Sequence, residues 1–249
     1  MPHSPSEGYT LTPSPQNFIQ KLRVHLLSRL LGKGLDNDDP CLYTDDERNS
    51  VRVINNIIFS ANEFSVNYTA YDIRRDRDTV NITNRPYVMI RSPEVGDNIH
   101  PYWYAQVLGI YHAPVSTTHP AAQKHSAQQV QFLWVRWLGA EPGHRSGSQV
   151  TRLPKIGFVE ATDDNAFEFL DPDLIIRGSH LIPAFHFGRT SNLMPYDGPT
   201  VARAVGETDD WVNFYVNVYV SQPHDPNTNS NQITDSQIVI CMYGILEAG

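Results

Sequence analysis

Two aromatic-rich runs decide the fold of this chain: PYWYAQVLGIYHA at 101–113 and QVQFLWVRWLG at 129–139. They contain three of the four tryptophans: Trp103, Trp134 and Trp137. Aromatic and β-branched residues are enriched in strands, and the segment between the runs is polar. The stretch from Tyr102 to Leu138 therefore predicts a hairpin of two long strands that belongs to the core. Gly109 predicts a bulge or bend in its first strand.

Alternation of apolar and polar residues predicts further strands on both sides of this hairpin. The pattern begins at Phe64, where apolar and polar residues alternate up to Tyr71. It is strictest from Trp211 to Val220, where every second residue is valine or phenylalanine. Such a period of two is typical of a strand with one buried face. Shorter strands are predicted at 86–90, 155–160, 175–176 and 180–187.

The first quarter of the chain predicts two helices. A proline at the first helical position and apolar residues at helical spacing predict a helix over 15–32. Thr44 and Glu47 have the spacing of a capping box, which marks the start of a second helix. We expect that helix to carry three apolar residues on one side: Val51, Ile54 and Ile58.

The composition limits the classes of function. Hydrophobic residues make up 40% of the chain and charged residues 18%, which indicates a globular protein with little charge. The net charge of -8 gives no overall attraction for nucleic acid, so such binding would need a local basic patch. No apolar run has the length of a membrane span, no secretory signal is present, and only two cysteines occur. We therefore expect an intracellular protein without a membrane partner.

Together these patterns predict an α+β fold that is mostly β. Two N-terminal helices are expected to pack on a curled antiparallel sheet or on a small SH3-like or BAH-like barrel. The expected organisation is a disordered tail at 1–13, a helical region at 14–60, a β domain at 61–220 and an atypical polar tail at 221–249.

The sequence carries no catalytic signature. The serine-hydrolase elbow, the zinc-protease motif, the phosphate loop and the dinucleotide fingerprint are all absent. Three aspartates that a nuclease would need lie only at the edges of predicted elements: Asp72, Asp171 and Asp210. Three histidines in or beside the hairpin loop lack the spacing of a zinc site: His112, His119 and His125. We therefore expect no enzyme activity, no catalytic residue, no metal and no cofactor.

Aromatic residues of the hairpin are the first candidates for a binding site. Exposed aromatic rings that converge can hold a methylated lysine by cation–π attraction. Alternation along a strand places about half of these rings in the core, so a purely structural role is the competing interpretation. The candidates are Tyr102, Trp103, Tyr104, Trp134 and Trp137.

Basic residues supply the second set of candidates, for contacts to nucleic acid. Within the run from Asp72 to Asp78 the charges sum to zero. This run is either a phosphate-contacting cluster or a solvated loop whose acids pair with its own arginines. The candidates are Arg74, Arg75, Arg77, Arg136, Arg145, Arg152 and Lys155.

Several long motifs of this chain resemble a known family. They are FIQKLRVHLLSRLLG at 18–32, YTDDERNSVRVINNIIFS at 43–60, VNYTAYDIRRDRDTVN at 66–81, HPYWYAQVLGIYHAPV at 100–115, QFLWVRWLG at 131–139, RLPKIGFVE at 152–160, FEFLDPDLIIRGSHLIPAFHFGRT at 167–190 and DDWVNFYVNVYV at 209–220. In order and spacing they resemble the C-terminal region of large proteins encoded by Plavaka-type DNA transposons of basidiomycete fungi, a CACTA-like group. The chain departs from the family after Val220, where Ser221-Gln222-Pro223 stands in place of the usual D-R-D-M-F-M-R-like segment and its glycine-rich, histidine-containing end.

The resemblance implies a non-enzymatic accessory domain of a transposon-encoded protein, located in the nucleus. Its expected partners are DNA, chromatin or a transposase core, and no small-molecule cofactor is implied. The family assigns no catalytic or binding residue to this region. Two alternatives remain: a decayed transposon fragment without a selected function, suggested by the altered tail and the missing core, and, less favoured, a metal-dependent nuclease.

Overall fold

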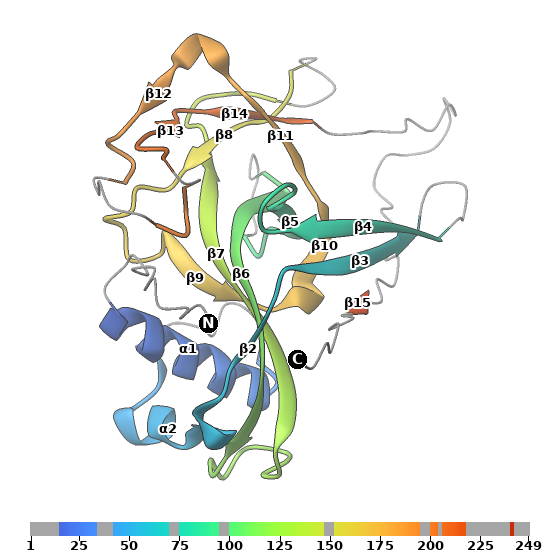
Figure 1. Cartoon of the computed structure of the whole chain (residues 1–249), viewed down its shortest axis with the longest axis vertical. Helices are drawn as coiled ribbons and strands as arrows, with labels where there is room; N and C mark the ends of the chain where they lie inside the picture. Colours follow the sequence, from blue (N-terminus) through green and yellow to red (C-terminus); the bar gives the residue numbers. More distant parts are fainter. Residues whose placement is uncertain are drawn as a thin grey trace, which may run out of the picture.

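The protein, described here from a computed structural model, is mostly β with few helices (Figure 1). The structure describes residues 15–33, 42–69, 75–94, 100–146, 152–194, 200–203, 206–217 and 240–241. Every strand pair among these residues is antiparallel, which confirms the predicted fold class at this level. The predicted tail at 1–13 lies outside the described residues, as does all of 221–249 except 240–241.

The predicted hairpin forms the centre of the sheet. Strand β6 (Tyr102–Thr117) pairs with β7 (Gln128–Ala140) from Tyr104↔Leu138 to Val115↔Gln128. The register shifts between Val107 and Gly109, which confirms the predicted irregularity at the glycine. A Cβ atom at Gly109 would overlap the Tyr111 ring, so a larger residue here would have to displace that ring.

The other strands extend this hairpin into one large sheet of order β10-β5-β6-β7-β8-β14-β11, with β1 and β2 on β6 and β9 on β7. The added strands are β1 (Val51–Val53), β2 (Phe59–Ala61), β5 (Tyr87–Arg91), β8 (Lys155–Phe158), β9 (Phe167–Leu170), β10 (Ile175–Gly178), β11 (His180–Pro183) and β14 (Phe214–Asn217). The path of paired strands is open, so a closed barrel is not seen. Its two end strands, β10 and β11, are nevertheless successive in the chain, with Ser179 alone between them.

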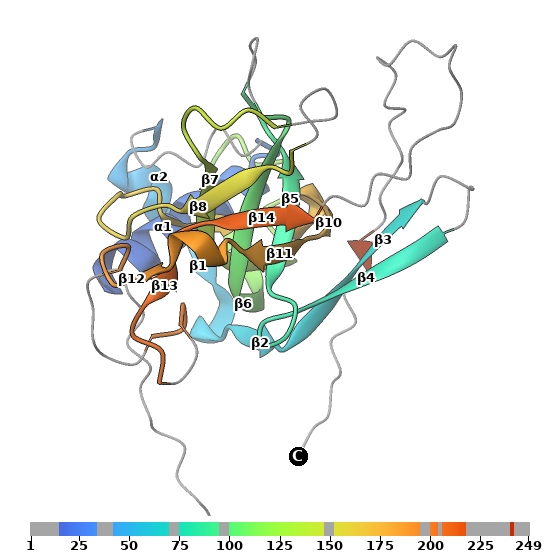
Figure 2. The ribbon, with the colours of Figure 1, turned by 90° about the horizontal axis from the view of Figure 1, so that it is seen from above.

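Smaller pairings lie outside this sheet. Strands β3 (Glu63–Thr69) and β4 (Arg75–Asn81) form a hairpin that reaches away from the body in both views (Figure 2). The short strand β15 (Ile240–Cys241) pairs with β3, and β12 (Arg189–Thr190) pairs with β13 (Asp210–Trp211). The charged run after Asp72 was expected in a loop. Its described part instead belongs to β4.

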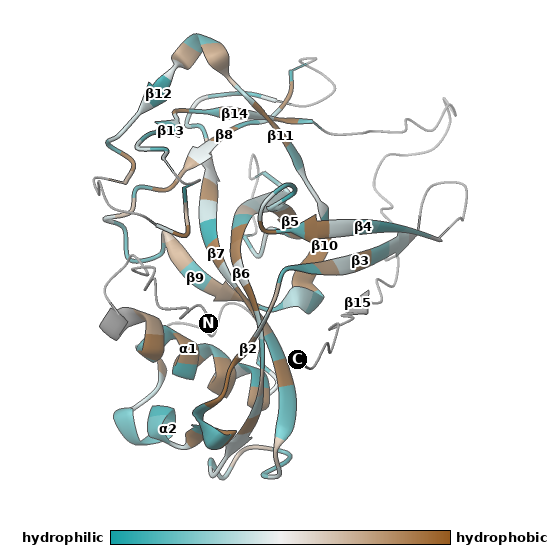
Figure 3. Cartoon of the chain, in the orientation of Figure 1, coloured by the Kyte–Doolittle hydropathy of each residue, from teal (hydrophilic) through white to brown (hydrophobic). Residues whose placement is uncertain are grey.

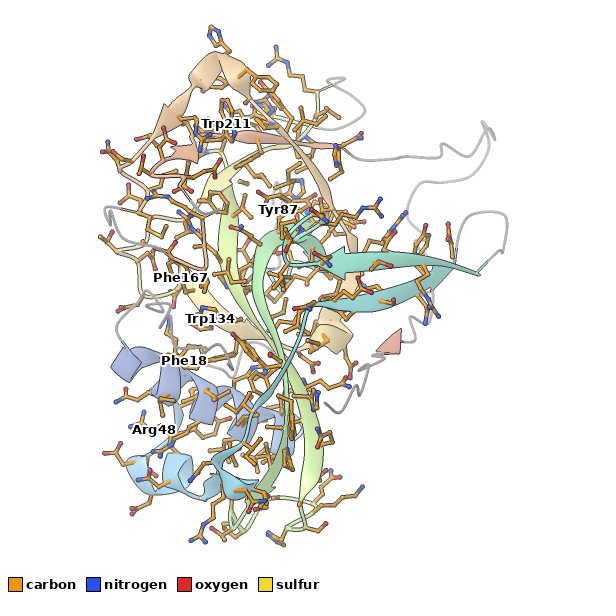
Figure 4. The ribbon with its side chains drawn as sticks, viewed as in Figure 1. Phe18, Arg48, Tyr87, Trp134, Phe167 and Trp211 are labelled. Carbon is orange, nitrogen blue, oxygen red and sulfur yellow. The ribbon has the colours of Figure 1, made fainter. Side chains whose placement is uncertain are left out.

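One amphipathic helix covers the lower half of the sheet. Helix α1 (Pro15–Leu30) buries Leu22, Leu26 and Leu27, and apolar residues line it in Figure 3. The Phe18 ring contacts the Trp134 ring edge-on at 5.0 Å (Figure 4). This helix confirms the prediction for 15–32 apart from its last residues. No helix in the described ranges combines the length and apolar character needed to cross a membrane.

The second predicted helix is much shorter than expected. Helix α2 (Asp45–Asn49) begins at the predicted capping box. The Thr44 side chain accepts from the Glu47 backbone amide, and the Glu47 side chain accepts from the Thr44 backbone amide. It ends before Val51, which enters β1 and pairs with Thr117 of β6. β-branched residues such as Val51 favour a strand over a helix where a neighbouring strand is available for pairing. Ile54 lies in the 3-10 turn η3 (Ile54–Asn56), and the Ile58 side chain is exposed.

Candidate functional site

The five aromatic candidates are divided among three parts of the core. Trp134 and Tyr104 are fully buried in different clusters, and Trp137 is buried in a third. Trp103 is half-buried and meets the Trp137 ring edge-on at 5.6 Å. Tyr102 is half-buried and packs against the Tyr104 cluster. The five rings therefore do not line one exposed pocket, because neighbouring residues of a strand face opposite sides of the sheet.

Arg136 is a core residue and does not contact solvent. Its side chain has no exposed surface, and its two terminal nitrogens donate to the Asp210 carboxylate at 3.1 and 3.2 Å. Arg203 donates to the same carboxylate at 2.8 Å, and the Arg136 guanidinium lies 3.9 Å from the Phe158 ring centroid. Burial lowers the pKa of Arg136 despite these bonds. Burial alone would raise the pKa of Asp210, but the two arginines outweigh it and lower that pKa.

The mixed-charge run offers no free basic cluster in its described part. Arg74 lies outside the described residues, and nothing is described of the side chain of Arg75. Arg77 is exposed on β4 and donates to Asn67 of β3 at 3.2 Å. Asp78 binds Arg177, outside the run, with Nε 3.0 Å from Oδ2, while Asp76 accepts from the Tyr68 hydroxyl at 2.9 Å and from the Arg77 backbone amide at 2.8 Å. For Asp78 this corrects the expectation that the acids pair with the arginines of their own run; Asp72 lies outside the described residues.

The remaining three basic candidates are brought together at the start of β8. A His144 ring nitrogen lies 3.0 Å from the carbonyl oxygen of Leu153, so the segment before the 147–151 gap runs beside the segment after it. Arg145 and Arg152 are the immediate neighbours of that bonded pair, and both are exposed. Lys155 follows as the first residue of β8.

Aromatic residues lie on the same side of the sheet as Lys155. Lys155 pairs with Tyr215 of β14, and Tyr215 pairs with Ile182 of β11, so the three side chains share one face. The Lys155 ammonium lies 4.3 Å from the Phe187 ring centroid, and the His144 ring lies 6.4 Å from the Tyr215 ring.

The other side of these strands is the core. Ile156, Leu181, Phe214 and Val216 alternate with the outward residues and are buried. The outward group is therefore held by a packed inner layer. We call it the aromatic–basic face; its residues are His144, Arg145, Arg152, Lys155, Ile182, Phe185, Phe187 and Tyr215.

Two phenylalanines of this face are unusually accessible. Phe185 is 70% exposed and Phe187 is 43% exposed. Both lie in the 3-10 turn η5 (Phe185–Phe187), which follows β11 at the top of Figure 1. The Phe185 ring meets the Trp211 ring edge-on at 5.2 Å. Large apolar side chains exposed together are typical of interaction sites.

The charge of the face differs in sign from that of the chain. The segments that build it are 139–146, 152–158, 179–188 and 213–217; they contain three cationic residues and one acid, Glu141. Glu141 accepts from Asn213 at 2.8 Å and lies 3.9 Å from the Lys155 ammonium. Within the described part of the chain no acid pairs with Arg145 or Arg152. The face is thus locally basic.

The sequence prediction does not identify Phe185, Phe187 and Tyr215 as surface residues. It treated 180–187 as one strand, whereas β11 ends at Pro183 and Gly188 follows η5 with a φ of 70°. It also treated 211–220 as one strand, whereas β13 ends at Trp211 and β14 begins at Phe214. The available signal was Phe-His-Phe between a proline and a glycine, which favours a turn over a strand.

The described residues offer no grouping for metal or cofactor chemistry. No three His, Cys, Asp or Glu side chains among them converge as metal ligands. Asp171 binds Arg29 at 2.6 Å, Asp210 lies in the buried arginine network, and Asp72 is outside the described residues. A pocket of about 150 Å³ between Lys33, Tyr43 and His119 is smaller than the few hundred Å³ usual for cofactor sites.

Comparison of the chain with family models, with curated proteins and with solved structures finds no match. The geometry of the aromatic–basic face is therefore the basis for a functional proposal.

Proposed function

We propose that this chain is a non-enzymatic accessory module that binds nucleic acid through the aromatic–basic face. One observation carries the proposal: Arg145, Arg152 and Lys155 gather beside exposed aromatic rings on a chain of net charge -8. Phosphate groups attract cations regardless of base sequence, and this term dominates non-specific binding. A locally basic face on an acidic chain directs that attraction to a single surface.

The biological setting of the proposal is a Plavaka-type transposon protein acting in the nucleus. The long motifs from Phe18 to Val220 support it. In that setting the face contacts DNA or chromatin while another surface contacts a transposase core.

We further propose that the sheet works as an SH3-like or BAH-like barrel. The support is the continuity of β10 and β11 through Ser179: one nearly unbroken stretch pairs with β5 at its start and with β14 at its end. The amide of Ser179 also donates to the Tyr87 carbonyl of β5 at 2.8 Å. A curled sheet of this kind keeps the outer side of β8, β14 and β11 rigid while its inner side is packed.

The test is a binding titration of labelled DNA at several salt concentrations. Two phosphate contacts, from the exposed Arg145 and Arg152, predict a logarithmic salt slope of about -1.8 for duplex, or roughly a 12-fold loss between 50 and 200 mM salt. Replacing Arg145, Arg152 and Lys155 together by alanine is expected to abolish this dependence.

The matched control removes the same charge elsewhere. Arg52, Arg85 and Lys124 are exposed and lie outside the face, and their triple alanine variant should bind as the wild type does. Equal weakening by both triple variants, or binding that ignores salt, would refute the proposal.

A further inference from the structure

The outer side of β8, β14 and β11 presents aromatic rings among polar side chains. Tyr215 and Phe187 lie on this side, Ile182 pairs with Tyr215 on β11, and Phe185 is exposed in the adjoining turn η5. Lys155 also lies on this side, with its ammonium against the Phe187 ring, as do His180 and Asn217, which pair with each other on β11 and β14. A ligand for such a surface needs flat apolar area together with negative charge close by.

We propose, on the basis of the nucleic-acid binding proposed above, that this face binds unpaired bases of a single strand. Bases stack on Phe187 and Tyr215, while Arg145 and Arg152 at the open end of β8 contact the phosphates. Each base carries a flat π-face, so this mode tolerates any sequence. Sheet surfaces with outward aromatic rings recognise single strands by stacking in this way.

Duplex DNA can meet the same surface only through its phosphates, not through its base faces. Its bases are stacked on one another, so their flat faces are not available to outward rings, and its base edges are read from within a groove by a helix or a ribbon. The helix α1 lies at the opposite end of the molecule from β11 and β14 (Figure 1). Within the described residues, no α-helix therefore lies beside the face to enter a groove of the DNA.

The dimensions suit a short stretch of nucleic acid. Lys155, Tyr215 and Ile182 occupy three adjacent strands, which are spaced about 4.8 Å apart, so the row spans roughly 10 Å. The turn η5 extends the apolar surface beyond β11. We expect two or three bases to be stacked, as on other sheet surfaces of this kind.

The experiment measures binding of the full chain to a fluorescent oligothymidine, an oligoadenine, a single-stranded RNA and a duplex of equal length. Two variants remove rings while keeping apolar bulk: Phe187→Leu and Tyr215→Leu. Each is expected to weaken single-strand binding by about fivefold or more, with little effect on the salt slope. The matched control is Phe59→Leu, which removes a ring that is 45% exposed on β2, away from the face.

The outcomes separate the two proposals. Tighter binding of single strands than of duplex, lost in the ring variants and kept in Phe59→Leu, supports base stacking. Equal binding of duplex, unchanged by the ring variants, overturns base stacking but leaves nucleic-acid binding in place. Absence of binding to all four probes overturns both. Unfolding midpoints of all variants show whether any loss comes from misfolding, and 2-aminopurine quenching reports stacking directly.

Discussion

Replacing Asp210 by asparagine should destabilise this protein more than any other change of a single charge in the described core. The carboxylate accepts three hydrogen bonds from two buried arginines: two from Arg136 and one from Arg203, at 2.8 to 3.2 Å. Asparagine keeps one acceptor oxygen and places an amide donor where the second oxygen was. The Arg136 guanidinium would then lie in the core without the charge of its Asp210 partner, and Arg203 would lose its ion pair with Asp210.

The magnitude follows from the burial of the three groups. The Arg136 side chain has no exposed surface, and those of Asp210 and Arg203 are 5% and 3% exposed. Breaking a buried pair by removing one partner costs about 3–5 kcal/mol, because a charge stays desolvated without compensation. For a domain of this size that corresponds to a fall of roughly 6–20 °C in Tm.

The assay is urea unfolding of the wild type and Asp210→Asn, with the free energy of unfolding compared at equal slope. Cooperative unfolding of the wild type would itself argue against a decayed fragment. A loss below about 1 kcal/mol would refute the reasoning, since it would show that water reaches the network.

The difference in the free energy of unfolding between the wild type and Asp210→Asn should depend on pH. The pKa of Asp210 is lowered below its ordinary value of 3.8 in the folded state. Its ionised form therefore stabilises the fold above about pH 4, and this contribution disappears as the pH falls through the lowered pKa. The stability gap between wild type and Asp210→Asn should be constant near neutral pH and should narrow only in acid.

Three further predictions concern the core and its chemistry. Leu26→Ala on the buried side of α1 should cost about 2–5 kcal/mol in urea unfolding, whereas Ile19→Ala, where the side chain is 48% exposed, should change stability by less than about 0.5 kcal/mol. Gly109→Ala should cost roughly 1–3 kcal/mol because the new methyl group overlaps a neighbouring ring; Gly139→Ala, which has space for a methyl group, should cost less, and equal losses would contradict the account. Burial raises the pKa of Tyr87 to about 12. The neutral phenol therefore stabilises the fold below about pH 10, and this contribution is lost between about pH 10 and 12. In an alkaline unfolding titration, Tyr87→Phe should retain its stability to higher pH than the wild type.

The aromatic–basic face also changes how the aromatic content of the chain is understood. The tryptophans of β6 and β7 drew attention as ligand contacts, yet Trp134 is fully buried beneath α1. The rings that the face offers to a partner are Phe187, in a turn after β11, and Tyr215 of β14. An apolar residue type does not reveal which side of a sheet it occupies; pairing does.

The sequence alone determined the features that depend on neighbours in the chain. The aromatic-rich run around Gly109, the capping box of Thr44 and Glu47, and the helical spacing after Pro15 each predicted an element that the structure contains. Local hydrogen bonds and backbone geometry decide such features, so the information lies within a few residues.

Only the tertiary structure decided the rest. The second helix ends at Asn49 because Val51 finds a partner strand more than sixty residues away, at Thr117. The aromatic–basic face joins segments from His144 to Tyr215 that no local pattern connects. Its existence depends on which strands pair and in which register, because a shift by one residue would turn Lys155 and its neighbours into the core.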